Sequence, residues 1–209
     1  MFSKFLNLKP EKQEKILEAA IKEFADKGFE KASTNEIIRE AGISKGILFH
    51  YFQNKKNIFL FVFDYYVEVC MEEFYKKVDL EEKDFFQKLR QISCFKLELV
   101  HKYPAIFRFF EVAIGEEASE VKSEIEKRKK KLTDSSYSKV FNNIDMSKFA
   151  DGVDVSRAIN IIMWTLEGLG TSELQKAKVS QSKHLDYEKV FAEIDIYIDI
   201  LKDTFYKQY

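Results

Sequence analysis

The chain has few of the residues that disulfide-stapled, all-β or membrane-spanning proteins require. Its 209 residues include 2 cysteines, 2 prolines and 7 glycines. Two cysteines cannot make a disulfide framework. An all-β fold needs a turn about every 8–12 residues, which so few glycines and prolines do not supply. The longest apolar run, Ile58–Phe63, is far shorter than the roughly 18 residues of a membrane span. We therefore expect no membrane partner.

An excess of charge of one sign is also absent. The 34 Lys and Arg residues nearly balance the 35 Asp and Glu residues, and the net charge is −1. This balance excludes a polycation that coats nucleic acid through its total charge. The charge is unevenly placed, because residues 1–57 carry a net charge of +3 and the remainder −4. The 20 Phe and 10 Tyr residues carry too much apolar surface for a disordered chain.

Patterns of catalysis and metal binding are missing as well. No histidine pairs with a cysteine or another histidine at metal-ligand spacing, and no Ser/His/Asp or Cys/His order is recognisable. Gly168-Leu169-Gly170 does not follow a strand, so it is not a dinucleotide-binding loop. We expect neither an enzyme nor a metal or other cofactor. The segment Phe2–Leu8 is short and carries Lys4, unlike a signal peptide, so we expect a cytoplasmic protein.

What the chain does have is helical periodicity, from which we predict an all-α fold of about nine helices. Helix signals include Pro10 at a first helical position, Gly28 at a C-cap and a capping box at Ser33–Glu36. The predicted helices are 10–28, 33–41, 45–52, 54–78, 84–102, 105–114, 116–139, 155–175 and 187–207. We expect a helix-turn-helix DNA-binding domain at 1–57 and a helical ligand-binding and dimerisation domain at 58–209.

The first of these regions carries a helix-turn-helix pattern. Two short helices are joined by Ala41-Gly42-Ile43-Ser44, where glycine tolerates the positive φ of a sharp turn. Leu48 and Phe52 lie at i, i+4 and point inward. Lys45, Gly46, Phe49 and His50 therefore face outward, at the end of the helix that would enter a major groove.

The sequence of residues 34–55, TNEIIREAGISKGILFHYFQNK, closely resembles the DNA-binding signature of TetR-type transcriptional regulators. In that family the second part reads A-G-V-S-K-G-T-L-Y-x-Y-F-x-[SN]-K. Ile47 stands where the family commonly has Thr, and Phe49 where it has Tyr, so two hydroxyl contacts to DNA are missing here. Beyond about residue 60 the resemblance is limited to length and helicity.

The resemblance implies a role for each matched residue. Lys45 and Gly46 match positions that read bases, Ile47 can contact a thymine methyl, and Phe49 lies beside them. The positions that hold phosphates are matched by Thr34, Ser44, His50, Tyr51 and Lys55. The implied partner is double-stranded DNA with a palindromic operator, bound by a homodimer that forms through the last two long helices.

The resemblance also implies an unknown small-molecule inducer that binds among the middle helices. Aromatic residues at helical spacing fill this region, and most are expected to be core. Glu98 and Glu167 are included because a carboxylate among apolar residues could meet a cationic ligand. The candidate ligand-binding residues are Tyr66, Cys70, Phe95, Glu98, Phe110, Met163, Trp164 and Glu167.

The function that we predict is a sequence-specific DNA-binding regulator, a repressor released from its operator by a ligand. One alternative is a ligand-independent or architectural DNA-binding factor of the same fold. Another is a helical interaction module that does not bind DNA, against which Lys45, His50, Lys55 and Lys56 count. The run Lys127–Lys131 follows several glutamates, so we interpret it as a solvated helix of mixed charge.

Overall fold

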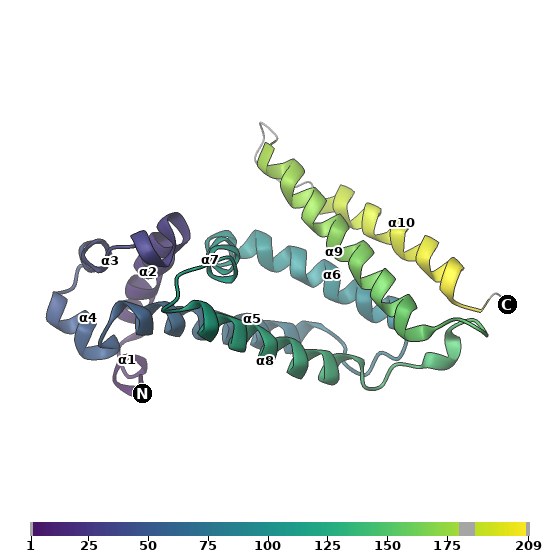
Figure 1. The fold of residues 1–209 in the computed structure, drawn as a ribbon, viewed down its shortest axis with the longest axis horizontal. Coiled ribbons are helices and arrows are strands. Elements are labelled where there is room, and N and C mark those ends of the chain that lie inside the picture. The colour runs from purple at the N-terminus through teal and green to yellow at the C-terminus, as the bar shows by residue number, and fades with distance from the viewer. Residues whose placement is uncertain (1, 180–186, 208–209) are drawn as a thin grey trace. The chain divides into compact units, whose positions relative to one another are not determined.

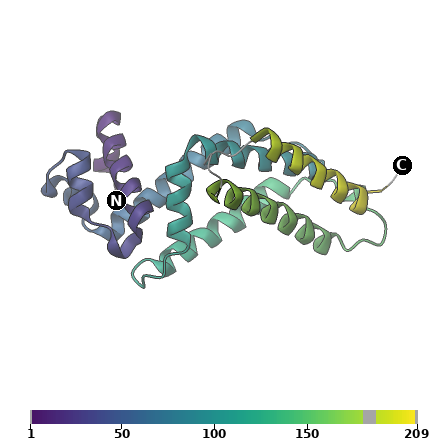
Figure 2. The same ribbon diagram turned by 90° about the horizontal axis from the view of Figure 1, so that it is seen from above.

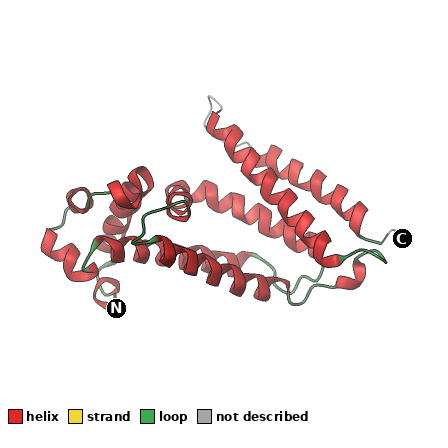
Figure 3. Cartoon of the chain, viewed as in Figure 1, coloured by secondary structure: helices red, strands yellow, loops and turns green. Residues whose placement is uncertain are grey.

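The computed structural model describes residues 2–179 and 187–207, and these residues are almost entirely helical (Figure 3). The predicted all-α fold is confirmed, since the described part contains no strand beyond one isolated bridge between Phe149 and Tyr206. The α-helices in chain order (Figure 1) are α1 Ser3–Leu6, α2 Pro10–Lys31, α3 Thr34–Ala41, α4 Lys45–Phe52, α5 Lys55–Lys77, α6 Phe85–Lys102, α7 Pro104–Ile114, α8 Lys122–Phe141, α9 Val155–Val179 and α10 Tyr187–Phe205. A short 3₁₀-helix, η1 (Met146–Lys148), precedes α9.

Several helix boundaries fall where the sequence predicts them. Pro10 is the first residue of α2, and Gly42 ends α3 in the left-handed conformation with φ 63°. Asn54 caps α5, because its side-chain oxygen accepts a hydrogen bond from the backbone N–H of Asn57 at 2.8 Å. These boundaries come from local chemistry, which a sequence expresses directly.

One predicted boundary is confirmed with an addition, and two local predictions are wrong. The regular helix from Pro10 breaks at Gly28, as predicted, because Gly28 has the non-helical values φ 71° and ψ 178°, and a further helical stretch continues to Lys31. The capping box does not form, since the backbone N–H of Ser33 donates to Glu23 at 2.8 Å rather than to Glu36. Residues 116–121 are not helical, and α8 begins at Lys122. At Ser33 the acceptor lies ten residues away in sequence, and local patterns do not express such a contact.

The short helix α1, before α2, is not among the predicted helices. Phe5 in α1 is fully buried, with ring centroids 4.9 Å from Phe52 and 5.2 Å from Phe61. These contacts explain why so short a helix is stable. Replacing a buried Phe by Ala typically lowers the free energy of unfolding by about 3–5 kcal/mol.

The chain packs into two compact units. The first unit comprises residues 1–73 and 99–136, and the second comprises residues 74–98 and 137–209. Helices α5, α6 and α8 each contribute residues to both units. The predicted functional boundary between residues 57 and 58 lies inside α5 and inside the first unit. It remains a prediction about function, because compactness and function need not divide a chain at the same residue.

The first unit is built around α2, which packs on α3 and on α7. Aromatic rings fill its core: Phe24 lies edge-on to Phe59 at 5.0 Å, and Phe59 lies edge-on to Phe109 at 5.3 Å. Leu48 and Phe52 of α4 are fully buried in the same core, as their i, i+4 spacing predicts. The core therefore fixes which face of α4 remains outside.

The second unit contains α9 and α10, which lie side by side (Figures 1 and 2). Val190, Ile194 and Ile198 of α10 are buried against Ile162 and Ala158 of α9. These three residues recur every four positions, the spacing of one apolar helix face, and within the chain this face is already covered. The exposed side of the same two helices is described below.

Candidate nucleic-acid interface

The outward face of α4 carries the residues that the sequence selects as base readers. Lys45, Gly46 and His50 are exposed, and Phe49 and Ile47 are half-buried. The Lys45 ammonium lies 6.0 Å from the centroid of the Phe49 ring, within the range of a cation–π contact. The exposed edge of α4 is thus cationic at its N-terminal end and apolar beside it.

The beginning of α4 is arranged to receive an anion. Ser44 is the N-cap, and its hydroxyl accepts a weak hydrogen bond from the backbone N–H of Ile47 at 3.4 Å. Within residues 2–179 and 187–207, the backbone N–H groups of Lys45 and Gly46 have no acceptor and face solvent. Unpaired N–H groups and the helix dipole together favour a phosphate oxygen at such a position.

The other predicted phosphate contacts lie around this helix. Thr34 is the first residue of α3 and is half-buried. Tyr51 is half-buried, with its ring 6.0 Å from Phe5 and 5.6 Å from His50. Figure 1 shows α3 and α4 together at one end of the first unit. All of these residues therefore belong to one compact segment with a shared core.

Lys55 makes contacts within the chain that the sequence does not predict. Its ammonium donates to the carbonyl oxygens of Glu30 at 3.0 Å and Ala32 at 3.3 Å, and it lies 4.7 Å from the centroid of the Phe29 ring. A cation at the last carbonyls of a helix stabilises that helix. Lys55 thus stabilises the end of α2 within the protein, independently of any contact with DNA.

The candidate ligand-binding residues are divided between the two units. Tyr66, Cys70 and Phe110 are half-buried in the first unit. Burial raises the pKa of the Cys70 thiol to about 11, and it also raises the pKa of Tyr66. Phe110 packs edge-on against Phe63 at 5.4 Å. These three residues are part of the aromatic core, and their ligand role remains a prediction.

The remaining candidates lie in the second unit. Phe95 is buried and packs edge-on against Phe74 at 5.8 Å. Glu98 is exposed and forms an ion pair with Lys77. Met163 is half-buried, whereas Trp164 and Glu167 are exposed. The two carboxylates therefore lie at the surface of the single chain, and the ligand role of these five residues remains a prediction.

A surface pocket of about 430 Å³ in the second unit was not anticipated. None of the candidate residues contributes to it; the residues that line it are Asp84, Gln87, Lys148, Lys202, Asp203, Tyr206 and Lys207. The one local signal for it was Asp84, an acidic residue directly before an apolar helix, which is typical of an N-cap. Gln87 follows in the first turn of α6, and the other members come from η1 and the end of the chain around α10, far away in sequence.

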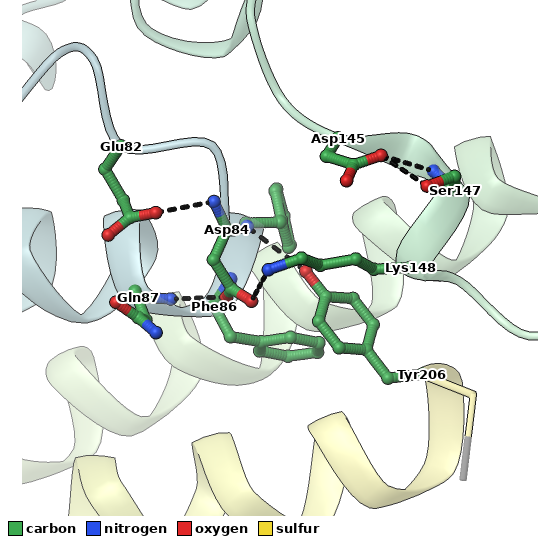
Figure 4. A network of polar contacts seen from close by, with 9 residues as sticks. Glu82, Asp84, Phe86, Gln87, Asp145, Ser147, Lys148 and Tyr206 are labelled. Atoms are coloured by element: carbon green, nitrogen blue, oxygen red, sulfur yellow. Dashed lines mark hydrogen bonds and ion pairs between the residues drawn. The ribbon is translucent and has the colours of Figure 1, made fainter. Parts of the chain in front are cut away.

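Polar contacts join these segments (Figure 4). The carboxylate of Asp84 accepts hydrogen bonds from the backbone N–H of Phe86 and Gln87, both at 3.0 Å, and from Lys148 at 2.8 Å. Tyr206 accepts the N–H of Phe85 at 3.1 Å. Burial opposes ionisation of Asp84, but Lys148 and the backbone N–H of Gln87 outweigh it and lower the pKa of Asp84. The network ties α10 and η1 to the start of α6.

Comparison with known proteins shows which family this helix-turn-helix matches. The family described as "Bacterial regulatory proteins, tetR family" matches residues 16–62, which run from α2 into α5. These residues form a TetR-type helix-turn-helix. The chain is also similar to the HTH-type transcriptional regulator YerO of Bacillus subtilis (strain 168), with 38% identity over 63 residues. That match covers 30% of this chain and only 22% of YerO, so it concerns the helix-turn-helix region alone.

Solved structures extend the TetR-type fold to the whole chain. A TetR family transcriptional regulator from Chloroflexus aurantiacus J-10-fl matches with a TM-score of 0.69 at 20% identity, covering 99% of this chain and 98% of that one. SmeT, solved in complex with triclosan, matches with a TM-score of 0.66 at 16% identity, covering 94% and 92%. At such identities the likeness establishes the fold.

Two negative observations complete the site. No helix in the described ranges is long and apolar enough to cross a membrane. Among those same residues, no group of three or more His, Cys, Asp or Glu side chains is placed to hold a metal ion.

Proposed function

We propose that this TetR-type protein binds a palindromic DNA operator as a homodimer and represses transcription until a small molecule releases it. The observation that carries the proposal is α4: a helix of eight residues whose apolar face is locked into an aromatic core. Its opposite face presents Lys45, Gly46 and His50 to solvent. A short helix held this way suits insertion into a major groove.

Within the groove, Lys45 and Gly46 are proposed to meet base edges. A lysine ammonium can donate to O6 and N7 of guanine, and a glycine lets the backbone approach closely. Ile47 offers a methyl surface to thymine, and Phe49 extends that surface. Thr34, Ser44, His50, Tyr51 and Lys55 are proposed to contact phosphates, which fixes the register of α4 without reading sequence.

The second copy is proposed to bind on the exposed side of α9 and α10. Four large apolar side chains there remain uncovered in the single chain: Trp164 is 68% exposed, Ile200 57%, Ile196 52% and Ile161 45%. Ile161 and Trp164 share one face of α9 at i, i+3, and Ile196 and Ile200 share one face of α10 at i, i+4. Two copies of this helix pair can form a four-helix bundle.

Two glycines support close approach of a second chain. A Cβ atom added at Gly168 or Gly170 of α9 would meet no atom of the described chain within 4 Å. These glycines therefore do not serve packing inside one chain. In a dimer they would let a neighbouring helix come near the backbone of α9, as small residues do at helix interfaces.

Release by a ligand is proposed to act through a population shift. A ligand can shift an equilibrium only by its difference in affinity for the two states, so it must prefer a dimer whose two α4 helices do not match the operator spacing. Helix α5 carries Lys55 at its start and contributes residues to both compact units. It is therefore the connection through which such a preference would reach α4. SmeT, of similar fold, was solved in complex with triclosan. Tyr66, Cys70 and Phe110 of the first unit offer an apolar ligand aromatic and sulfur surface.

The test is selection from a random DNA pool by the purified full chain at two salt concentrations. We expect one palindrome to be enriched, with binding that weakens steeply as salt rises because phosphate contacts release counterions. Enrichment of a non-palindromic half-site alone would contradict the dimer. No enrichment at either salt concentration would overturn the proposed function.

A ligand-independent DNA-binding factor of the same fold is the second candidate. The surface positions of Glu98 and Glu167 favour it, because neither carboxylate is enclosed to meet a cationic ligand. Native mass spectrometry of the purified dimer separates the two candidates. A retained small molecule whose removal changes operator affinity supports the ligand-responsive regulator, whereas operator affinity that no bound molecule alters supports the alternative.

A further inference from the structure

Helix α2 contains a break whose hydrogen bonding is completed by a residue almost ninety positions away. Gly28 has φ 71° and ψ 178°, values that no helical residue adopts. The break leaves the following N–H, that of Phe29, to find an acceptor outside the helix. The carboxylate of Glu116 accepts it through Oε2 at 2.6 Å.

The other oxygen of the same carboxylate binds the start of the following segment. Oε1 of Glu116 accepts the backbone N–H of Ala118 at 3.1 Å. Glu116 stands directly after Gly115, the C-cap of α7. A Cβ atom added at Gly28 would lie 3.1 Å from Oε2 of Glu116, so glycine is needed there both for its positive φ and for room. One carboxylate thus joins the end of α7 to the break in α2.

Helix α7 itself is packed along α2. Phe109 of α7 contacts Phe59 at 5.3 Å and Phe24 at 6.3 Å, and Arg108 pairs with Asp26 at 3.0 Å. Glu116 extends this contact past the last turn of α7. Any displacement of α7 along its axis would therefore act on the break at Gly28.

The four residues after the break lead straight into the helix-turn-helix. Phe29 is buried edge-on against Phe59 at 5.3 Å, and the Lys55 ammonium binds the carbonyl oxygens of Glu30 and Ala32. At the far end, Glu23 accepts the N–H of Ser33, the N-cap of α3. The connection into α3 is short, is anchored by the buried side chains of Phe29 and Ala32, and is hydrogen-bonded at both ends, so it transmits displacement instead of absorbing it.

We infer that Glu116 is a positioning residue that couples the place of α7 to the orientation of α3 and α4. This inference rests on the proposed function, because it assigns the coupling to DNA recognition. Helix displacements of about 1–2 Å are common in switching proteins, and one of that size would break the 2.6 Å bond from Phe29 to Glu116. The segment 29–33 would then lose the hydrogen bond that fixes its first residue. As a result, α4 would no longer be held in one orientation on the operator.

The test compares three variants of the full chain. Glu116→Ala removes the acceptor, and Glu116→Gln keeps a neutral one. Glu117→Ala is the matched control, because Glu117 is the neighbouring carboxylate, is 78% exposed and forms an ion pair with Lys122 at the surface. The readouts are amide hydrogen exchange over residues 28–33 without DNA, and the ratio of affinities for the operator and for the operator with one base pair inserted between its half-sites.

In Glu116→Ala we expect exchange at Phe29 to rise by roughly tenfold, the value of a hydrogen bond to a charged group, and the spacing ratio to fall by a similar factor. Glu116→Gln should lie between this variant and the wild type, and Glu117→Ala should equal the wild type. A purely structural role would lower the melting temperature but leave the spacing ratio of the folded protein unchanged.

Failure of the inference is distinct from failure of the proposed function. If wild type and Glu116→Ala both select the operator with the same spacing ratio, the inference is overturned and DNA binding stands. If the wild type selects no DNA, the proposed function fails. The inference, which rests on that function, then fails as well. Unchanged exchange at Phe29 in Glu116→Ala would show, without any DNA, that Glu116 does not hold the start of segment 29–33.

Discussion

The outer face of α4 and the outer face of the α9–α10 pair differ in what they leave exposed. Helix α4 exposes Lys45, Gly46 and His50, whereas α9 and α10 expose Trp164 and Ile200. Both helical regions bury their opposite faces in ordinary apolar cores. The difference indicates two kinds of partner, because a cationic helix end suits a polyanion and an uncovered apolar face suits another apolar face.

The largest effect is expected at the apolar face. Trp164→Glu should raise the dissociation constant of the dimer by at least about a hundredfold, because a central Trp is a typical hot spot and a two-fold interface loses it twice. Sedimentation equilibrium or light scattering at several concentrations measures this. Leu6→Glu, which replaces another half-exposed apolar residue, should leave the mass unchanged. Equal dimer stability in both variants would refute the assignment of this face.

The next effect is expected at the cationic face. Lys45→Ala should lower operator affinity by about 1–3 kcal/mol and reduce the preference for operator over scrambled DNA. Lys12→Ala, an exposed lysine near the start of α2, serves as the control of equal charge. Fluorescence anisotropy on both DNAs measures the ratio. A Lys45→Ala variant that binds both DNAs more weakly but keeps the full ratio of operator to scrambled-DNA affinity would show that Lys45 contacts only phosphate.

A stability effect of similar size is expected where Asp84 caps α6. Asp84→Ala should cost about 1–2 kcal/mol of unfolding free energy, the usual value of an N-cap. Because the pKa of Asp84 is lowered in the fold, its contribution is present above the unfolded pKa near 3.8 and is lost as pH falls through the folded value. Urea unfolding at pH 7 and pH 3 should therefore show a smaller loss on acidification in Asp84→Asn than in the wild type. Equal losses would exclude this group as a source of acid sensitivity.

The smallest effect is expected for Lys55. As a phosphate contact, Lys55→Ala should weaken all DNA sequences about equally and flatten the logarithmic salt slope by about 1 unit. The structure adds a cost in stability, because the ammonium also binds carbonyl oxygens at the end of α2. Salt titrations of the folded variant separate the two roles. An unchanged slope with lowered melting temperature would assign Lys55 to the fold alone.

The sequence predicted these two faces unequally well. The helix-turn-helix is encoded locally: Gly42 needs a positive φ, Ser44 caps α4, and Leu48 and Phe52 face inward at i, i+4. These features lie within eleven residues, and the structure contains each of them. Gly46, exposed beside them, needs no partner inside the chain.

What the sequence could not predict depends on contacts between distant residues. The acceptor for Phe29 comes from Glu116, and the acceptor for Ser33 comes from Glu23 rather than from the expected capping box. Likewise, the spacing of Val190 and Ile194 indicates an apolar helix face. It does not indicate that this face is covered within the chain while Ile196 and Ile200 remain exposed. Periodicity shows that a helix has an apolar face; only packing shows which neighbour covers it.

The most direct test of the account is the stoichiometry and affinity of the complex on the selected operator. The account predicts two chains on one palindromic site, and an affinity for the full site at least about a hundredfold above that for a single half-site, since linked binding multiplies effective concentration. Sedimentation of labelled DNA with the full chain measures both quantities. One chain per site, bound equally well to a half-site, would contradict the account.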